Sequence, residues 1–252
     1  MTTMNGDRNI TLLVCALGGE GGGVLAEWLV DIATACGHSA QSTSIPGVAQ
    51  RTGATTYYLE FCPRPDAELG GRRPVFGLSP VPGALDLLVS SELLEAARQA
   101  AAGYVSADRT HVLSAAGRTL TTVEKLSLGD GRYDAEALRR LVGAYSHALQ
   151  LFDLHGIVRR SGTAPSAVLL GAIAASGVLP FPRAAYERLV REGGKGVEAS
   201  LRGFDAAYRA LAADVAEAAP AAMPAPPAAP AVPVAARAFP EAVRSIVALG
   251  HP

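Results

Sequence analysis

Residues 9–23 of the chain, NITLLVCALGGEGGG, join an uninterrupted apolar run to a cluster of glycines. The run from Asn9 to Leu17 is typical of a strand that is buried on both faces of a sheet. Residues 24–36 repeat apolar side chains at helical spacing, and Gly37 is suited to end that helix. The stretch therefore predicts a strand, a tight glycine turn and a helix whose N-terminus faces an anion or a partner.

Similar patterns continue along the chain. Residues 54–61 (ATTYYLEF) favour a pleated strand, and residues 85–90 and 111–114 indicate two further strands. We expect helices at 92–102, at 134–154, at 166–176, from Pro182 onward, and at 196–218. The first six elements follow the order β-α-β-β-α-β, which predicts an α/β fold. The expected architecture is a three-layer sandwich with a mainly parallel or mixed sheet, plus C-terminal helices and an Ala/Pro-rich linker.

The end of the chain has a different composition. Residues 220–234 are almost entirely Ala, Pro and Val, which is typical of an extended, semi-rigid linker. We therefore expect one domain over residues 1–218, a linker over 219–238, and a short helical tail over 239–252. The tail resembles the start of a further, truncated domain.

Charge and composition exclude several classes of protein. The 22 Lys and Arg residues balance 23 Asp and Glu residues without a basic stripe, so nucleic acid is not an expected partner. The polar N-terminus and the lack of a long apolar run predict no signal peptide and no membrane span, hence a cytoplasmic protein. The three cysteines, Cys15, Cys36 and Cys62, have no metal-ligand spacing, so we expect buried thiols and no iron–sulfur cluster in this chain.

The glycine loop is the first candidate site, through Gly18, Gly19, Glu20, Gly21 and Gly22. It matches the dinucleotide fingerprint only loosely, so an anion of another kind or a partner contact is the preferred interpretation. The Glu20 carboxylate, placed near the helix N-terminus, is expected to interact with the helix dipole and to repel a phosphate. A tight turn without a ligand remains an alternative.

A second loop offers Ser44, Gln50, Arg51, Thr52 and Gly53. The guanidinium group of Arg51 has a planar set of donors that matches a phosphate or a carboxylate. The Pro46-Gly47 pair restricts the path of the loop, which leads directly into the strand at 54–61. An arginine exposed to solvent at a loop tip is the simpler interpretation.

No catalytic set is evident elsewhere. The five histidines are scattered without metal spacing, and no serine occupies a strand–turn–helix elbow. An α/β protein with binding loops and no catalytic residues is consistent with one subunit of a larger enzyme. A stand-alone Rossmann-like nucleotide-binding or regulatory module is the alternative.

Four segments carry a resemblance to a known family: LGGEGGGVLAEWLVDIA, QSTSIPGVAQRTGATTYYLEF, SELLEAAR and GAIAASGVLP. Over residues 9–210 the chain resembles the gamma-type (domain III) subunit of 2-oxoacid:acceptor oxidoreductases, most of all the small (beta) subunit of the indolepyruvate ferredoxin oxidoreductase type. Gly18, Gly19 and Gly21 match the family loop Gly-x-Gly-Gly-Gln-Gly, whereas Ala16 and Glu20 depart from it. Ala49, Gln50, Arg51 and Gly53 match the Ala-Gln-Arg-x-Gly element.

The resemblance implies a division of labour. A large partner subunit, in a hetero-oligomer of α2β2 type, would hold thiamine diphosphate, Mg²⁺ and iron–sulfur clusters, and ferredoxin or another acceptor would take the electrons. The enzyme would convert aryl-pyruvates such as indolepyruvate to arylacetyl-coenzyme A. This chain would bind no cofactor alone, would be inactive when isolated, and would line the coenzyme A side of the cleft with both loops. The departure at Glu20 makes Arg51 the better candidate for binding phosphate.

Overall fold

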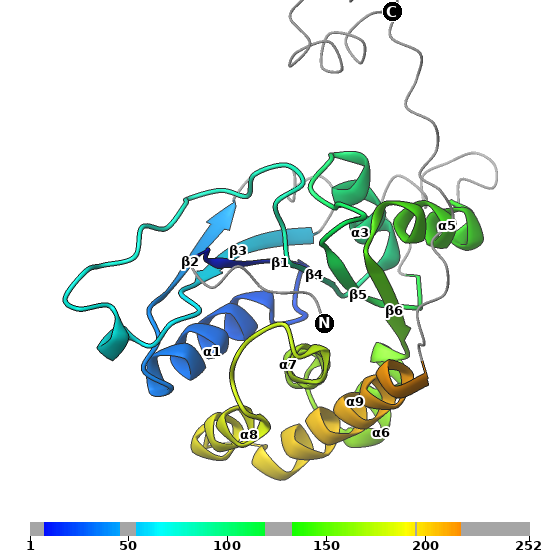
Figure 1. Cartoon of the computed structure of the whole chain (residues 1–252). Coiled ribbons are helices and arrows are strands. Elements are labelled where there is room, and N and C mark those ends of the chain that lie inside the picture. Colours follow the sequence, from blue (N-terminus) through cyan, green and yellow to red (C-terminus); the bar gives the residue numbers. More distant parts are fainter. Residues whose placement is uncertain (1–7, 46–53, 119–132, 195, 218–252) are drawn as a thin grey trace, which may run out of the picture. The chain divides into compact units, whose positions relative to one another are not determined.

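The computed structural model describes residues 8–45, 54–118, 133–194 and 196–217 of the chain. These residues form a six-stranded mixed sheet in the order β2-β3-β1-β4-β5-β6 (Figure 1). The strands are β1 (Ile10–Leu17), β2 (Ala40–Ile45), β3 (Ala54–Phe61), β4 (Leu87–Ser90), β5 (His111–Ala115) and β6 (Ala148–Phe152). The expected α/β sandwich with a mixed sheet is thereby confirmed.

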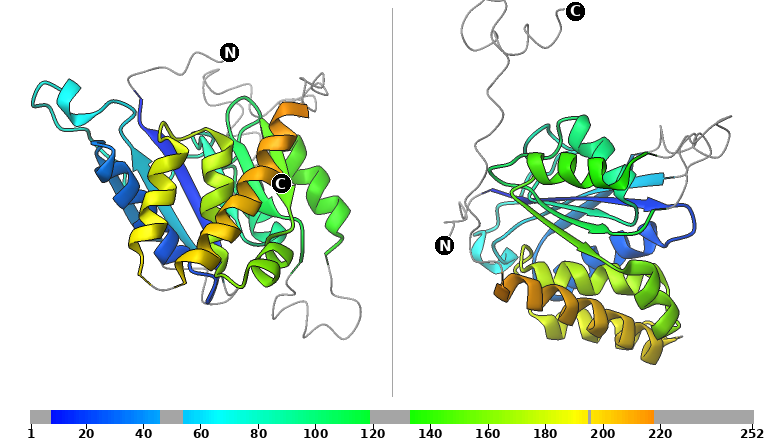
Figure 2. Two further views of the ribbon diagram at one scale, coloured as in Figure 1. Left: turned by 90° about the horizontal axis from the view of Figure 1, so that it is seen from below. Right: turned by 90° about the vertical axis from the view of Figure 1, so that its right-hand side faces the viewer.

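Helices cover both faces of the sheet. One face carries α1 (Gly22–Ala35), α6 (Leu154–Ser161), α7 (Pro165–Ser176), α8 (Arg183–Glu192) and α9 (Val197–Glu217). The other face carries α3 (Leu93–Ala101) and α5 (Ala135–Tyr145), which gives the three layers that are visible edge-on in Figure 2. A short 3₁₀ turn, η1 (Asp66–Glu68), interrupts the long connection between β3 and β4.

The buried side chains divide between the two faces. The larger cluster includes Leu12 and Val14 of β1 together with α1 and the helices α6 to α9. The smaller cluster includes Leu13 and Cys15, the alternate residues of β1, and packs against α3 and α5. Both sets of alternate side chains on β1 are therefore buried, which explains why residues 9–17 form a continuous apolar run.

The parallel and antiparallel pairings determine which loops share an edge. β1 pairs in parallel with β4, and β4, β5 and β6 continue in parallel. β3 runs antiparallel to both β1 and β2, with Leu17 opposite Ala54. The C-terminal ends of β1, β2, β4, β5 and β6 and the start of β3 therefore lie at one edge of the sheet, called the carboxyl edge below.

One expectation about the middle of the chain is wrong in detail, and one strand was not predicted. The predicted helix at 134–154 ends at Tyr145, and residues 148–152 form β6, which pairs with β5. Residues 40–45 form an edge strand, β2, although AQSTSI is largely polar. Both added strands are edge strands with partly exposed side chains.

The helices of the C-terminal half otherwise follow the pattern. Pro182 is the N-cap residue of α8 rather than its first helical residue, a shift of one position. Gly177 ends α7 in the left-handed conformation (φ 66°), as expected of a residue that stops a helix. Residues 219–252, with the expected linker and tail, lie outside the described residues.

Candidate functional site

The glycine loop connects β1 to α1 through two residues with positive φ angles, Gly19 (86°) and Gly21 (75°). The turn is closed by a 3.0 Å hydrogen bond from the Glu20 amide to the Leu17 carbonyl oxygen. Gly21 is the N-cap residue of α1, and no side chain caps this helix. The first amide groups of α1 are therefore available to a ligand at the positive end of the helix dipole.

The loop borders a surface hollow of about 330 Å³. Its lining consists of Ala16, Leu17, Gly18, Gly19, Gly21, Gly22, Gly23, Val24, Thr55 and Tyr57. A Cβ atom on Gly22 would lie 2.7 Å from the Ala16 Cβ and 2.8 Å from Cε2 of Tyr57, so only glycine allows this approach of helix to sheet. Among the described residues, only backbone and uncharged side chains face the hollow.

Glu20 is oriented differently from our expectation. Its Oε2 accepts a hydrogen bond from the Leu17 amide at 3.3 Å, and its Oε1 lies 3.2 Å from Nε2 of His155. The carboxylate therefore neither caps α1 nor lines the hollow. Contacts with the ring at the start of α6 and with the backbone of β1 thus orient this carboxylate, and its expected repulsion of a bound phosphate stays a prediction.

The loop after β4 borders the glycine loop. The Ser91 hydroxyl accepts a hydrogen bond from the Leu17 amide at 3.1 Å. The following helix, α3, lies on the face opposite to α1, so the chain changes faces between the neighbouring strands β1 and β4. Ligands of open α/β sheets bind in the crevice at such a switch point, beyond the carboxyl ends of the strands.

Glu92, at the start of α3, is buried next to this crevice, with 1% of its surface exposed. Its Oε2 accepts hydrogen bonds from the amides of Leu94 (2.7 Å) and Glu95 (3.3 Å), which caps α3. Its Oε1 accepts a 2.6 Å bond from Nε of Arg118, just after β5. A buried carboxylate that both caps a helix and pairs with an arginine stabilises the shape of the crevice.

Burial also affects the titration of two neighbouring groups. Desolvation, aided by the charge of Glu95, raises the pKa of the Cys15 thiol well above its ordinary value. Desolvation likewise raises the pKa of Glu95, against the opposing effect of Arg98. The Cys15 thiol is thus held neutral in the core and is unsuited to act as a nucleophile.

Four residues of this edge escaped the sequence analysis: Ser91, Glu92, Arg118 and His155. Each of them follows a parallel strand, and this position after a strand is the signal in the sequence that could have identified them as site residues. The Glu92–Arg118 and Glu20–His155 contacts join residues far apart in the chain, so spacing alone does not reveal them.

Only part of the second predicted loop is described. Ser44 lies on β2 opposite Tyr57, with its side chain exposed. Gln50, Arg51, Thr52 and Gly53 lie outside the described residues. The strands that flank residues 46–53 reach the carboxyl edge, because Ile45 pairs with Thr56 and Ala54 pairs with Leu17. The two predicted loops are therefore connected to strand ends at the same edge of the sheet.

Within the described residues no group of three or more His, Cys, Asp or Glu side chains is arranged to hold a metal ion. The three cysteines are free thiols; Cys15 and Cys62 are buried, as expected, whereas Cys36 is only partly buried. No helix in the described part of the chain is both long and apolar enough to cross a membrane.

Solved structures share this fold, among them the following three. A pyruvate oxidoreductase subunit from Thermotoga maritima aligns with a TM-score of 0.54 and 16% identity, over 81% of this chain and 97% of that one. The gamma subunit of a keto/oxoacid ferredoxin oxidoreductase from Geobacter sulfurreducens aligns with a TM-score of 0.52 and 18% identity, over 82% and 98% of the two chains.

The third is a 2-oxoglutarate:ferredoxin oxidoreductase from Magnetococcus marinus, with 2-oxoglutarate, coenzyme A and succinyl-CoA bound. It aligns with a TM-score of 0.54 and 13% identity, over 88% of this chain and 34% of that longer one. No curated protein matches the chain by sequence.

The chain thus has the α/β fold of these oxidoreductase subunits. The family model for pyruvate ferredoxin/flavodoxin oxidoreductase matches residues 11–210, which include the whole sheet and most of its helices. The chain therefore belongs to the pyruvate ferredoxin/flavodoxin oxidoreductase family, whose members act in 2-oxoacid:ferredoxin oxidoreductases.

Proposed function

We propose that the chain is the gamma-type (domain III) subunit of a thiamine-dependent 2-oxoacid ferredoxin oxidoreductase. Its substrates are indolepyruvate and related aryl-pyruvates, and the product is the arylacetyl-coenzyme A. The observation that carries the proposal is the glycine hollow at the carboxyl edge, in a chain that belongs to this family. The aryl-pyruvate assignment rests on the resemblance of the segments around both loops to the indolepyruvate type.

The hollow has the properties of a site for one anionic end of coenzyme A. The uncapped start of α1 offers backbone amides, which suit a phosphate oxygen. The Glu20 carboxylate is held away from it by Leu17 and His155. A volume of about 330 Å³ accommodates a phosphate group or part of the pantetheine arm rather than the entire coenzyme.

In this assignment the residues of the chain bind and orient, and they transfer no protons. Gly18, Gly19, Gly21 and Gly22 line the hollow, and Arg51 is proposed to bind a phosphate group. Gln50, Thr52, Gly53 and Ser44 would complete the wall next to the partner. Thiamine diphosphate, when bound with Mg²⁺ in the large partner subunit, supplies the decarboxylation chemistry, and iron–sulfur clusters there carry the electrons to ferredoxin or another acceptor.

The proposed organisation follows the composition of the chain. Residues 1–218 are the domain that joins the catalytic complex, residues 219–238 are the linker, and residues 239–252 are a helical tail. We propose a cytoplasmic α2β2 assembly with the large subunit.

Reconstitution tests the proposal. The chain is expressed alone and together with a large thiamine-binding subunit from the same genome. Alone, it should contain no stoichiometric iron or thiamine and show no activity. Together, the two should co-purify and reduce ferredoxin in a reaction that requires both coenzyme A and indolepyruvate.

Three results would contradict the proposal or a part of it. Iron or thiamine bound stoichiometrically to the isolated chain would refute the division of labour. An isolated monomer that binds a nucleotide and ignores the large subunit would favour the regulatory module instead. Activity with pyruvate but not with aryl-pyruvates would retain the subunit role and refute the substrate.

A further inference from the structure

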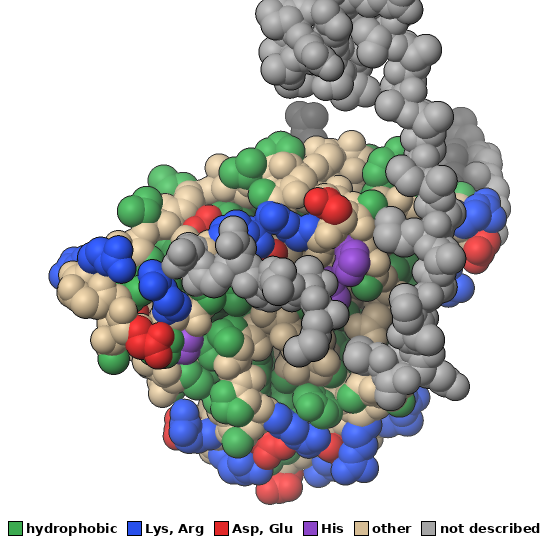
Figure 3. All heavy atoms as spheres, viewed as in Figure 1, with side chains coloured by type: hydrophobic (Ala, Val, Ile, Leu, Met, Phe, Trp, Pro, Cys, Tyr) green, Lys and Arg blue, Asp and Glu red, His purple; other side chains and the backbone are tan. Residues whose placement is uncertain are grey.

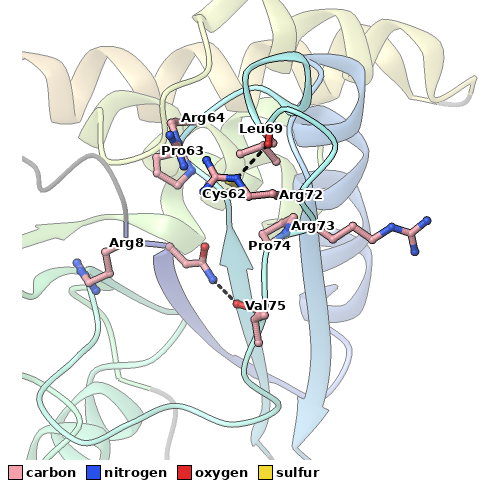
Figure 4. Close-up of a pocket in the computed structure, with 10 residues that line it drawn as sticks. Arg8, Cys62, Pro63, Arg64, Leu69, Arg72, Arg73, Pro74 and Val75 are labelled. Carbon is pink, nitrogen blue, oxygen red and sulfur yellow. Dashed lines mark hydrogen bonds between the residues drawn. The ribbon is translucent and has the colours of Figure 1, made fainter.

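A second cavity, of about 400 Å³, lies at the edge of the sheet opposite to the glycine loop. Arg8 and Asn9 precede β1, and Cys62 to Arg64 follow β3, whose last residue, Phe61, pairs with Ile10 at the start of β1. The connection after η1 forms the remaining wall with Leu69, Arg72, Arg73, Pro74 and Val75 (Figure 4). No part of this cavity contributes to the function proposed above.

The lining is strongly basic. Four of its ten residues are arginines, and none is acidic, among the residues that the structure describes. On the face drawn in Figure 3, arginine side chains lie around the η1 connection, with acidic side chains beside them. Over α8 and α9, in contrast, arginines pair with Glu187 and Asp205. The cavity therefore combines concave shape with an excess of positive charge.

Three acidic side chains near the cavity have hydrogen-bond partners, and two of them bond to residues of the cavity lining. Asp66 accepts hydrogen bonds from the Ser39 amide (3.0 Å) and hydroxyl (2.7 Å). Glu60 accepts from the Tyr58 hydroxyl and from Nδ2 of Asn9 (2.9 Å). Asp86 accepts from the backbone amide of Thr11 at 2.8 Å and pairs with Arg8. Among the four arginines, Arg8 thus pairs with a carboxylate outside the cavity lining, and Arg64 also has an interaction partner.

Arg64 and Arg72 present their charges to the same place. Nε of Arg72 donates to the Leu69 carbonyl oxygen at 3.3 Å, which fixes the plane of the guanidinium group. Its two Nη nitrogens have no hydrogen-bond partner among the described residues. In Figure 4 this group points toward that of Arg64, above Cys62, whereas the Arg73 side chain points away. Two like charges that face each other favour an anion between them.

The far wall is also fixed. Nδ2 of Asn9 donates to the Val75 carbonyl oxygen at 2.8 Å, which ties the connection after η1 to the start of β1 (Figure 4). Pro63, Leu69, Pro74 and Val75 add apolar surface beside the arginines. A cavity of this size, with apolar walls and convergent charged donors, has the composition of a small-molecule site.

We infer that this cavity binds a small phosphorylated molecule, with a phosphate group between Arg64 and Arg72 and its less polar part against Pro63, Leu69 and Pro74. The planar sets of N–H donors on two arginines match the oxygens of a phosphate group, and a phosphate has enough oxygens to accept from both side chains. The site is separate from the glycine hollow and would operate as a second, independent binding position on this subunit.

Calorimetric titration of the full chain with pyrophosphate, at physiological ionic strength, tests the inference. Arg64→Ala and Arg72→Ala should each weaken binding about ten- to hundredfold, the loss expected from one charge-assisted contact. Arg73→Ala is the matched control, because it removes the same charge from the neighbouring residue whose side chain points away, and it should change the affinity less than about twofold. Gly22→Ala, in the glycine hollow, should leave this binding intact.

Three outcomes would overturn the inference. The first is that the wild-type chain does not bind pyrophosphate. If it binds a hexaglutamate peptide instead, the cavity would take an acidic protein partner. The second is an equal loss with Arg73→Ala, which would indicate general charge attraction. The third is loss with Gly22→Ala but not with Arg72→Ala, which would place the anion in the glycine hollow. Circular dichroism of each variant shows whether it has folded.

Discussion

Glu20 and His155 are 135 positions apart in the chain but meet at the carboxyl edge of the sheet. Oε1 of Glu20 lies 3.2 Å from Nε2 of His155. Glu20 is the residue at which this chain departs from the glutamine of the family loop. The contact, together with the bond from the Leu17 amide, orients the acidic side chain away from the glycine hollow. An acid is thereby accommodated in a loop that is proposed to bind an anion.

Glu20→Gln should leave coenzyme A binding nearly unchanged. The amide retains an acceptor for the Leu17 amide and a hydrogen-bonding group for His155, and the removed charge does not face the hollow. We expect a KM for coenzyme A within about twofold of wild type in the reconstituted enzyme, while Glu20→Ala loses about 1 kcal/mol of stability. A tenfold decrease in KM for Glu20→Gln would show that the carboxylate repels the substrate after all.

Gly22→Ala should impair the glycine hollow. The added methyl group would lie 2.7 Å from the Ala16 Cβ and 2.8 Å from Tyr57, which pushes α1 away from the sheet. We expect a loss of about 1–3 kcal/mol in urea unfolding and weaker use of coenzyme A. Gly19→Ala is the control: its Cβ meets nothing within 4 Å, so only the positive φ of 86° costs about 1–2 kcal/mol. Equal KM values for the two variants would argue against a ligand in the hollow.

Gly171→Ala should destabilise the helical layer strongly. α7 approaches α9 so closely at this point that a Cβ on Gly171 would lie 2.2 Å from the Phe204 carbonyl oxygen. Because the obstacle is backbone, the helices must separate, and we expect a loss of about 3 kcal/mol or more in chemical unfolding. Gly177→Ala, after the end of α7, meets no atom within 4 Å and should cost about 1–2 kcal/mol through its positive φ. Similar losses for both variants would contradict the close helix contact.

Arg51→Ala should weaken coenzyme A use more than 2-oxo acid use. Loss of one charge-assisted contact of about 1.5–3 kcal/mol corresponds to a rise of about ten- to hundredfold in the KM for coenzyme A. Arg191→Ala, an exposed arginine of α8 that pairs with Glu187, is the control and should have no effect. Steady-state kinetics of the reconstituted complex measure both, and an unchanged KM in Arg51→Ala would remove this residue from the site.

His111 should make stability depend on pH. Burial lowers its pKa from 6.5, and nearby His147 acts in the same direction, while Asp86, which also pairs with Arg8, opposes them. The folded chain then binds fewer protons than the unfolded chain below about pH 6.5, so stability is full above this pH and falls as the pH decreases. His111→Gln should flatten this part of the curve of unfolding free energy against pH. Parallel curves for variant and wild type would contradict the lowered pKa.

Local signals in the chain were sufficient for much of the architecture. Ala54 to Phe61 were predicted as a strand from their β-branched and aromatic side chains, and the structure has the same bounds. Gly37 was predicted to follow a helix end, and it has a positive φ angle of 77°. Such signals act within a few residues, so the local structure that they favour does not depend on the rest of the chain.

The same local logic was wrong where a strand depends on its neighbour. Leu149 and Phe152 continue the apolar spacing of Leu138 and Val142, which favoured one long helix. The chain instead leaves the helix at Ser146, and residues 148–152 pair with β5, because hydrogen bonds to an open sheet edge replace those of further helical turns. Only the presence of β5 decides between these two patterns.

The candidate site shows the same division. The sequence by itself determined the glycine loop, since a turn with positive φ at Gly19 and Gly21 requires those residues locally. The tertiary structure decided where the Glu20 charge points, because His155 becomes its neighbour only after β6 is placed in the sheet. It also brought Arg64 and Arg72 to one cavity, since the connection after η1 returns across the end of β3. Contacts of this kind depend on strand order, which no spacing along the chain encodes.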